Sequence, residues 1–179
     1  MKPASCPDLD LAGFALRPLL RSDAAGWYDY LKLEAVTRDT SWSLSGVQDL
    51  APLFDAFESD APGSSLRFAI VDTASGRLAG SVGFHTVSPL NRTAEIAYDL
   101  APDYWGRGLA TAACKAVSAW GLAEQGYVRV QATCLDTNEP SRQVLLRSGY
   151  ELEGRLRSLR LVRGEPRDFW VFSRLSRPA

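Results

Sequence analysis

The 179-residue sequence has 46% hydrophobic and 23% charged residues, an ordinary composition for a folded globular protein. Its formal net charge of −1 gives no electrostatic reason to expect binding to nucleic acid or to a membrane surface. No apolar run approaches the length of a membrane span, and the polar start lacks the apolar segment of a signal peptide. The length predicts one domain over residues 1–179, with residues 1–10 as a loose lead-in.

The cysteines and the single histidine argue against several kinds of site. Cys6, Cys114 and Cys134 are odd in number and far apart, so they show neither a metal-binding spacing nor a disulfide framework. One histidine, His85, supports neither a zinc site nor a Ser-His-Asp triad. The sequence therefore predicts no bound metal and a cytoplasmic, reducing environment.

The N-terminal half predicts four strands and two helices. Ser22 and Asp23 precede apolar residues at helical spacing and indicate the start of the first helix. A break rich in Pro, Gly and Ser follows the second helix at residues 61–65. The strands are expected at 14–18, 66–71, 78–87 and 94–100, and the helices at 22–31 and 46–59.

Residues 99–111 join the fourth strand to the next helix through Gly106 and Gly108. Two glycines at a helix start leave backbone N–H groups unobstructed, and the helix dipole adds positive charge there. Phosphate groups bind at such helix starts, so this stretch is a candidate anion site. The other interpretation is an ordinary glycine-containing turn.

The C-terminal half predicts a helix from Leu109 that ends near Gly126, and a strand with clean alternation at 127–134. Asn138 is placed to cap a short helix that runs through Leu146 and closes at Gly149. Two further strands meet at residues 163–165. This order predicts an α/β fold, a mixed central sheet of about seven strands with helices on both faces.

Five motifs, in the same order along the chain, give this sequence a family resemblance. It resembles the GNAT acetyltransferases, and more narrowly their RimJ/RimL-like branch. This resemblance implies the GNAT fold and transfer of an acetyl group from acetyl-CoA to a primary amine by direct attack. The motifs are 91–96, 102–110, 138–141, 148–150 and 153–157, the last followed by Gly164 and residues 168–170.

The resemblance also implies which residues bind acetyl-CoA. The segment Trp105 to Ala110 corresponds to the family's pyrophosphate loop, with N–H donors at Gly106, Arg107, Gly108 and Ala110. The branch often has Trp where Trp105 stands, and the broader family has Gln or Arg. The charge of Arg107 could lie near phosphate, or Arg107 could be a solvated residue at the helix start.

One strand segment and one helix-cap residue are expected near the pantetheine arm. The strand segment from Tyr98 to Leu100 matches the family's edge that pairs with pantetheine amides, which requires a locally splayed sheet. Asn138 corresponds to a residue near the same arm, or it serves simply as a helix cap.

Amine attack on a thioester needs a proton acceptor, a donor for the developing negative charge on oxygen and a donor for the leaving thiolate. Glu95 is the candidate base; the other interpretation is an exposed carboxylate paired with Arg92 or Arg129. A backbone N–H between Ala97 and Asp99 is the candidate donor to oxygen.

Ser141 is the candidate donor to the thiolate, at a motif where related enzymes often carry a Tyr that is Leu145 here. The other interpretation of Ser141 is a first-turn serine satisfied by its own helix. His85 could be an alternative base or a substrate contact, or a structural histidine. Trp42 is expected to line the acceptor cleft, or to be a buried loop residue.

The acceptor is expected to be a protein or peptide N-terminus, or a small-molecule amine including antibiotics. The resemblance leaves open a homodimer. One rival interpretation is a CoA-binding or regulatory module without catalysis. Another is a nucleotide-binding domain, but the sequence lacks Gly-Lys-Ser/Thr and has a lone Gly-x-Gly.

Overall fold

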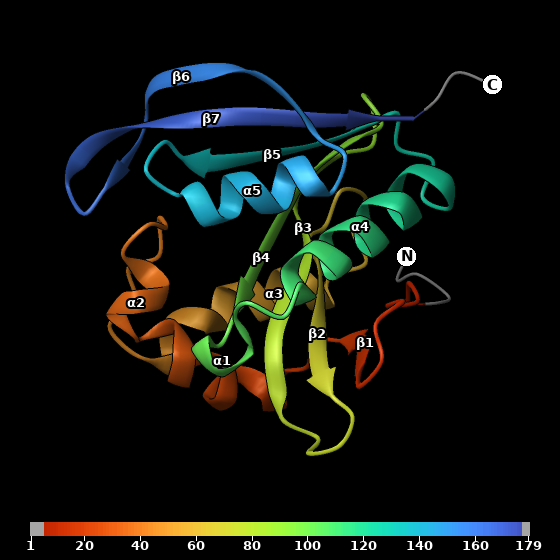
Figure 1. Cartoon of the computed structure of the whole chain (residues 1–179), viewed down its shortest axis with the longest axis vertical. Coiled ribbons are helices and arrows are strands. Elements are labelled where there is room, and N and C mark those ends of the chain that lie inside the picture. The colour runs from red at the N-terminus through yellow and green to blue at the C-terminus, as the bar shows by residue number, and fades with distance from the viewer. Residues whose placement is uncertain (1–5, 177–179) are drawn as a thin grey trace.

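Within residues 6–176, which the computed structural model describes, seven strands form one mixed sheet in the order β1-β2-β3-β4-β5-β7-β6 (Figure 1). Neighbouring strands are antiparallel except for β4 and β5, which run parallel. The predicted mixed sheet is therefore confirmed. The strands are β1 (Phe14–Pro18), β2 (Leu66–Asp72), β3 (Leu78–Ser88), β4 (Thr93–Leu100), β5 (Arg129–Leu135), β6 (Glu151–Val162) and β7 (Glu165–Leu175).

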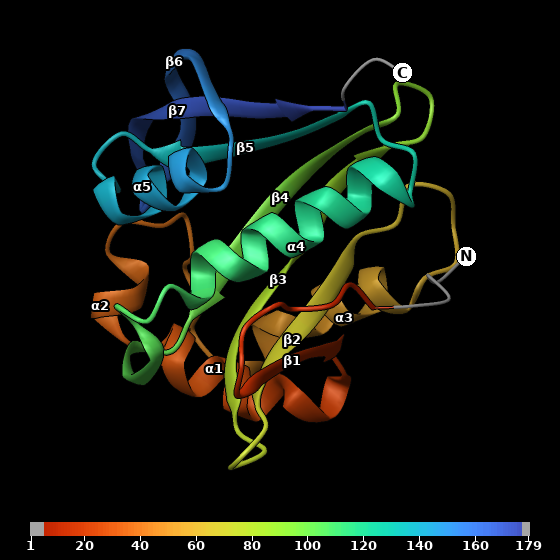
Figure 2. The same cartoon turned by 45° about the vertical axis from the view of Figure 1, so that its right-hand side comes forward.

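Helices cover both faces of the sheet. On one face, α4 (Leu109–Ala123) crosses the central strands and α5 (Glu139–Arg147) lies beside β5 (Figure 2). The other face carries α1 (Ala24–Leu31) and α3 (Ala51–Glu58), with the four-residue α2 (Glu34–Thr37) between them in sequence. None of these helices, nor any other in the described chain, is long and apolar enough to cross a membrane.

The two larger of three hydrophobic clusters in the described chain follow from the alternation of side chains along the strands. Phe68 and Ile70 of β2 pack in the core shared with α4, whereas Ala69 between them packs in the core shared with α1 and α3. Burying each large apolar side chain of these cores contributes roughly 1.5–3 kcal/mol to folding. The second core centres on Trp27, Leu31, Leu50 and Phe54.

The parallel pair β4 and β5 separates soon after it begins. Thr93 to Glu95 pair with Arg129 to Gln131, and the pairing ends there. Beyond Glu95 the two strands diverge, as Figure 1 shows. The sheet is therefore open between the C-terminal halves of β4 and β5, as the family resemblance required.

A β-bulge in β3 lies opposite the start of this opening. Phe84 pairs with Ile96 and Thr86 pairs with Glu95, so His85 is an extra residue in β3. Such a bulge bends a strand and re-aims the extra side chain. It places His85 beside Glu95 of the neighbouring strand.

Candidate active site

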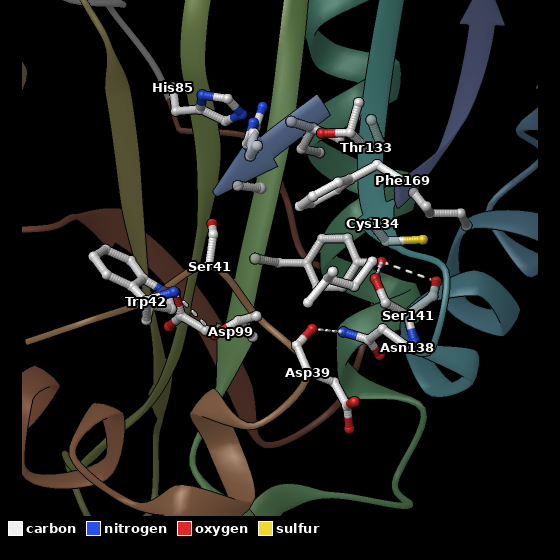
Figure 3. Close-up of a pocket in the computed structure, with 18 of the residues that line it drawn as sticks. Asp39, Ser41, Trp42, His85, Asp99, Thr133, Cys134, Asn138, Ser141 and Phe169 are labelled. Atoms are coloured by element: carbon white, nitrogen blue, oxygen red, sulfur yellow. Dashed lines mark hydrogen bonds between the residues drawn. The ribbon is translucent and has the colours of Figure 1, made fainter. Parts of the chain in front are cut away.

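A cavity of about 490 Å³ occupies the opening between β4 and β5 (Figure 3). One wall is formed by Ile96 to Asp99 of β4, and the facing wall by Ala132 to Leu135 of β5 together with α5. The loop from Asp39 to Trp42 closes one side. The cavity is therefore built from segments far apart in sequence, around the strand that bears the predicted base.

The exposed edge of β4 offers backbone groups to this cavity. The N–H of Ala101 donates to the carbonyl of Ala79 on β3, at 2.9 Å. In an antiparallel pair, alternate residues exchange these bonds, so the N–H and C=O groups of Tyr98 and Leu100 point away from β3. The carbonyl of Leu100 accepts a hydrogen bond from the indole N–H of Trp105, at 3.0 Å. The backbone of Tyr98 faces the open side of the strand.

The turn after β4 has the backbone that a helix-start anion site requires. Gly106 and Gly108 both have φ of 74°, in the left-handed region that glycine adopts without strain. Gly108 precedes the 15-residue helix α4 without a side-chain cap, which leaves the first N–H groups of the helix available. Arg107 is exposed and its guanidinium lies over the ring of Tyr104, 5.4 Å from the centroid.

Glu95 is the last residue of β4 that pairs with β5, and donors from three other strands hold its carboxylate. Thr133 Oγ1 donates to Oε1 at 2.7 Å and Gln131 Nε2 donates to Oε2 at 3.1 Å. His85 Nε2 lies 3.3 Å from Oε1, and the guanidinium of Arg160 on β6 lies 3.4 Å from the same oxygen. The carboxylate is thus buried, at 8% exposure, with its oxygens hydrogen-bonded.

These contacts correct the expected alternative for Glu95. Arg129 pairs with Glu153, at 2.5 Å, and Arg92 donates to the carbonyl of Gly126. Both arginines therefore have other partners, and the carboxylate of Glu95 is buried rather than exposed. Burial alone would raise the pKa of Glu95. The hydrogen bonds from its neighbours and the charge of protonated His85 outweigh this effect and lower the pKa to about 2.

Ser141 faces the cavity from the first turn of α5, where a tyrosine hydroxyl meets it. Its Oγ lies 2.9 Å from the hydroxyl oxygen of Tyr98 on β4. The alternative interpretation, in which this hydroxyl is satisfied by its own helix, is therefore wrong. Burial raises the pKa of Tyr98 well above its ordinary value, so this hydroxyl keeps its proton.

Asn138 is the predicted N-cap of α5 and also ties down a loop. Its Oδ1 accepts a hydrogen bond from the N–H of Ser141, at 3.0 Å. Its Nδ2 donates to the carbonyl of Asp39, at 2.8 Å, which fixes the loop that closes the cavity. The structural interpretation of Asn138 is thus confirmed; an amide nitrogen has a second hydrogen for a further partner.

His85 and Trp42 both line the cavity, as Figure 3 shows. His85 is partly exposed, with Nδ1 at 3.0 Å from Thr86 Oγ1. Trp42 is half-buried and packs edge-on against Trp27, with ring centroids 5.8 Å apart. Each side chain therefore makes a structural contact and also forms part of the cavity lining.

Sequence reasoning missed three contributors to the site: Arg67 of β2, Arg160 of β6 and the hydroxyl group of Tyr98. Arg67 carried a signal, because a charged residue inside the apolar run 66–71 must find a buried partner. The other two became visible only when distant strands were brought together. In residues 6–176, no group of three or more His, Cys, Asp or Glu side chains is arranged to hold a metal ion.

Comparison with known proteins gives consistent matches. The family model described as Acetyltransferase (GNAT) domain matches residues 14–151. An uncharacterized N-acetyltransferase of Bacillus subtilis, YoaA, is 29% identical over 171 residues, which is 93% of this chain and 96% of that protein. The ribosomal-protein-serine acetyltransferase of Escherichia coli is 33% identical over 99 residues, 55% of each chain.

Among solved structures, spermidine N-acetyltransferase from Vibrio cholerae in complex with CoA and spermine is similar with a TM-score of 0.81. The similarity covers 93% of this chain and 97% of that chain, at 18% sequence identity. At this identity, the match shows a common fold.

Proposed function

The chain belongs to the GNAT family and is an acetyl-CoA-dependent N-acetyltransferase, and we propose that the cavity between β4 and β5 is where the acetyl group passes to a primary amine. The observation that carries this proposal is the opening beside Tyr98, next to a glycine turn at a helix start. The acceptor is proposed to be a peptide or protein N-terminus, or a small-molecule amine.

The residues at the opening fit acetyl-CoA. The N–H groups of Gly106, Arg107, Gly108 and Ala110 lie at the start of α4, where pyrophosphate oxygens would be stabilised. The C=O of Tyr98 suits an amide N–H of pantetheine, and the second amide hydrogen of Asn138 suits the same arm. The carbonyl of Leu100 already accepts a hydrogen bond from Trp105. Leu100 is therefore proposed to shape this edge of the strand by its position and not to bind pantetheine through its carbonyl.

The donor molecule supplies an activated thioester carbonyl, and the chain supplies proton transfer. The amine nitrogen forms the new C–N bond, the C–S bond breaks, and one amine proton must leave. We assign this proton to the pair formed by His85 and Glu95. His85 Nε2 is the proposed proton acceptor, and the buried carboxylate of Glu95, 3.3 Å away, orients and stabilises the imidazolium that forms.

Ser141 is proposed to donate to the departing thiolate. If the hydroxyl group of Tyr98 donates to Ser141 Oγ, the hydrogen of Ser141 is free to turn into the cavity. The raised pKa of Tyr98 supports a hydrogen-bonding role rather than full proton release. The pair thereby stands in for the tyrosine that this motif lacks at Leu145.

The acceptor side of the cavity combines aromatic rings with a cationic side chain. Trp27, Trp42 and Phe57 line it, and Arg160 lies over the ring of Phe169, 5.3 Å from the centroid. Polycations gain from free carboxylates, whereas the two carboxylates that line the cavity already have partners: Asp99 pairs with Arg67, and Asp39 accepts a hydrogen bond from Thr137. These features favour a peptide N-terminus or an aromatic amine over a polyamine.

A thiol-release assay with acetyl-CoA tests the proposal against the alternative of a silent CoA-binding module. The acceptor panel comprises peptides with free N-termini, aromatic and aliphatic amines, and spermidine. Amine-dependent thiol release supports the proposal. Tight acetyl-CoA binding without release across the panel supports the module.

A further inference from the structure

Arg67 lies in the middle of β2 with 6% of its surface exposed, and all three guanidinium nitrogens have partners. Nε donates to Ser81 Oγ at 2.9 Å, and one terminal nitrogen forms an ion pair with Asp99 at 2.5 Å. The other terminal nitrogen donates to the backbone carbonyl of Ala97 at 2.9 Å. A buried guanidinium therefore binds a peptide group of the strand that borders the cavity.

The strand register explains how Arg67 reaches a strand that is not its neighbour. Arg67 pairs with Gly83 on β3, and Gly83 pairs with Ala97 on β4. A Cβ atom at Gly83 would clash with the carbonyl oxygen of Leu66 and would lie 2.8 Å from the Cα of Arg67. Glycine at this position therefore lets β2 and β3 approach closely. Because residue 83 has no side chain, Arg67 can reach across β3 to the backbone of β4.

The peptide that Arg67 contacts is the one whose N–H belongs to Tyr98. In a trans peptide, the C=O and N–H groups point in opposite directions. Since the carbonyl of Ala97 points toward β3 and Arg67, the N–H of Tyr98 points toward the opening beyond the last β4–β5 pair. A charge-assisted hydrogen bond at the carbonyl polarises the whole peptide and makes its N–H a stronger donor.

We infer that Arg67 is a positioning residue that strengthens the Tyr98 N–H as the donor to the thioester carbonyl oxygen during acetyl transfer. The inference rests on the proposed function. Asp99 does not remove this effect, because its carboxylate also accepts from Trp27, Tyr30 and Ser81 and so is shared among several donors. Donors aimed at developing oxyanion charge are among the largest contributions to acyl transfer.

Isotope-edited infrared spectroscopy of acetyl-CoA labelled with ¹³C at the thioester carbonyl tests the inference. In the wild-type protein, the carbonyl stretch should move to lower frequency on binding, because the Tyr98 N–H weakens the C=O bond. Arg67→Lys keeps the charge beside Asp99 but loses the two-pronged geometry. It should lose most of this shift and about tenfold in kcat, with KM for acetyl-CoA nearly unchanged.

The matched control is Tyr30→Phe, which removes a different hydrogen bond to Asp99 and leaves the Arg67–Ala97 contact in place. It should keep the low carbonyl frequency. The double variant Arg67→Gln, Asp99→Asn removes both charges without leaving an unpaired buried carboxylate, and should also lose the shift. This double variant decides the question if Arg67→Lys fails to fold.

Two results would overturn the inference while the proposed function stands. One is a wild-type enzyme that transfers acetyl groups without a lowered carbonyl frequency. The other is a folded Arg67 variant that keeps the full shift. Failure of the wild-type protein to bind acetyl-CoA would contradict the proposed function as well.

Discussion

His85 Nε2 lies 3.3 Å from Glu95 Oε1, and a one-residue bulge in β3 brings the two side chains together. Without the bulge, alternation along β3 would give residue 85 a different direction. The pair stands at the point where β4 and β5 separate, so a proton acceptor lies at the mouth of the proposed acetyl-transfer cavity. Its carboxylate accepts hydrogen bonds from Thr133 and Gln131.

Removing either His85 or Glu95 should lower kcat more than it weakens substrate binding. Glu95→Gln and His85→Gln should each lower kcat by about 100-fold, since general bases contribute that much or more. The double variant should be little slower than either single variant, because two residues that act as a unit are not additive. Steady-state kinetics of the three variants checks this; effects that multiply would show that the residues act separately.

The same pair predicts a pH profile. Because the pKa of Glu95 is about 2, its carboxylate stays ionised throughout the neutral and mildly acidic range. Any loss of kcat between pH 5 and 7 in the wild type must therefore come from a group other than Glu95. An acid limb of the kcat profile in this range should persist in Glu95→Gln; its disappearance would show that it arises from Glu95 and would contradict the low pKa of Glu95.

The stability of the fold should also depend on Glu95 ionisation. The folded pKa of about 2 lies below the ordinary value of 4.5, so the carboxylate stabilises the fold above pH 4.5. This contribution, on the order of 3 kcal/mol, is lost as the pH falls toward 2. Urea unfolding of Glu95→Gln should therefore lack this part of the pH dependence between pH 4.5 and 2.

Glu153→Gln is the matched control for this measurement. Hydrogen bonds from Arg129 and Ser173 also lower the pKa of Glu153 to about 2, but its side chain is 39% exposed. Water and salt screen an exposed pair, so its contribution should be small and should fall with added salt. Equal effects of the two substitutions would contradict the importance of burial at Glu95.

The glycine turn should be required for acetyl-CoA affinity beyond its effect on folding. Gly108→Ala places a Cβ in a left-handed conformation and should cost roughly 1 kcal/mol of stability. It should also raise KM for acetyl-CoA several-fold, because the strained turn re-orients N–H donors. Gly76→Ala, in the turn between β2 and β3, has φ of 70° and equally open space, and should leave KM unchanged.

Loss of either hydroxyl group in the Tyr98–Ser141 pair should affect catalysis moderately. Ser141→Ala should lower kcat about tenfold, since water can replace the donor, and Tyr98→Phe should have a smaller effect of the same kind. Tyr150→Phe is the control. Tyr150 pairs with Ser118 at 2.6 Å inside the core, away from the cavity. It should lower stability without changing kcat; an equal fall in kcat would indicate a general effect of lost packing.

The sequence predicted the elements whose signals are local. The strands carry alternating patterns, Asn138 caps α5 as expected, and the left-handed glycines mark the turn before α4. The strand expected at 127–134 lies two residues later at its start, because Val128 is exposed just outside the sheet. The four-residue α2 escaped prediction since so short a helix has almost no periodicity.

The partners of Glu95 could not be predicted, because they depend on register between distant strands. Arg129 lies directly in the neighbouring strand but turns to Glu153 on β6. The bulge at His85 has no distinctive sequence signal and yet determines the geometry of the proposed base. Local patterns thus predicted the strands, the cap of α5 and the glycine turn, whereas tertiary packing determined the polar contacts between these elements.

The central claim is that acetyl groups pass from acetyl-CoA to an amine at this cavity. Incubation with acetyl-CoA carrying an isotope-labelled acetyl group, followed by mass spectrometry of the acceptor panel, tests it most directly. We predict label on the nitrogen of a peptide N-terminus or aromatic amine, with at least a tenfold lower rate in Glu95→Gln. Tight binding of acetyl-CoA with no labelled acceptor, or equal labelling by wild type and Glu95→Gln, would contradict the account.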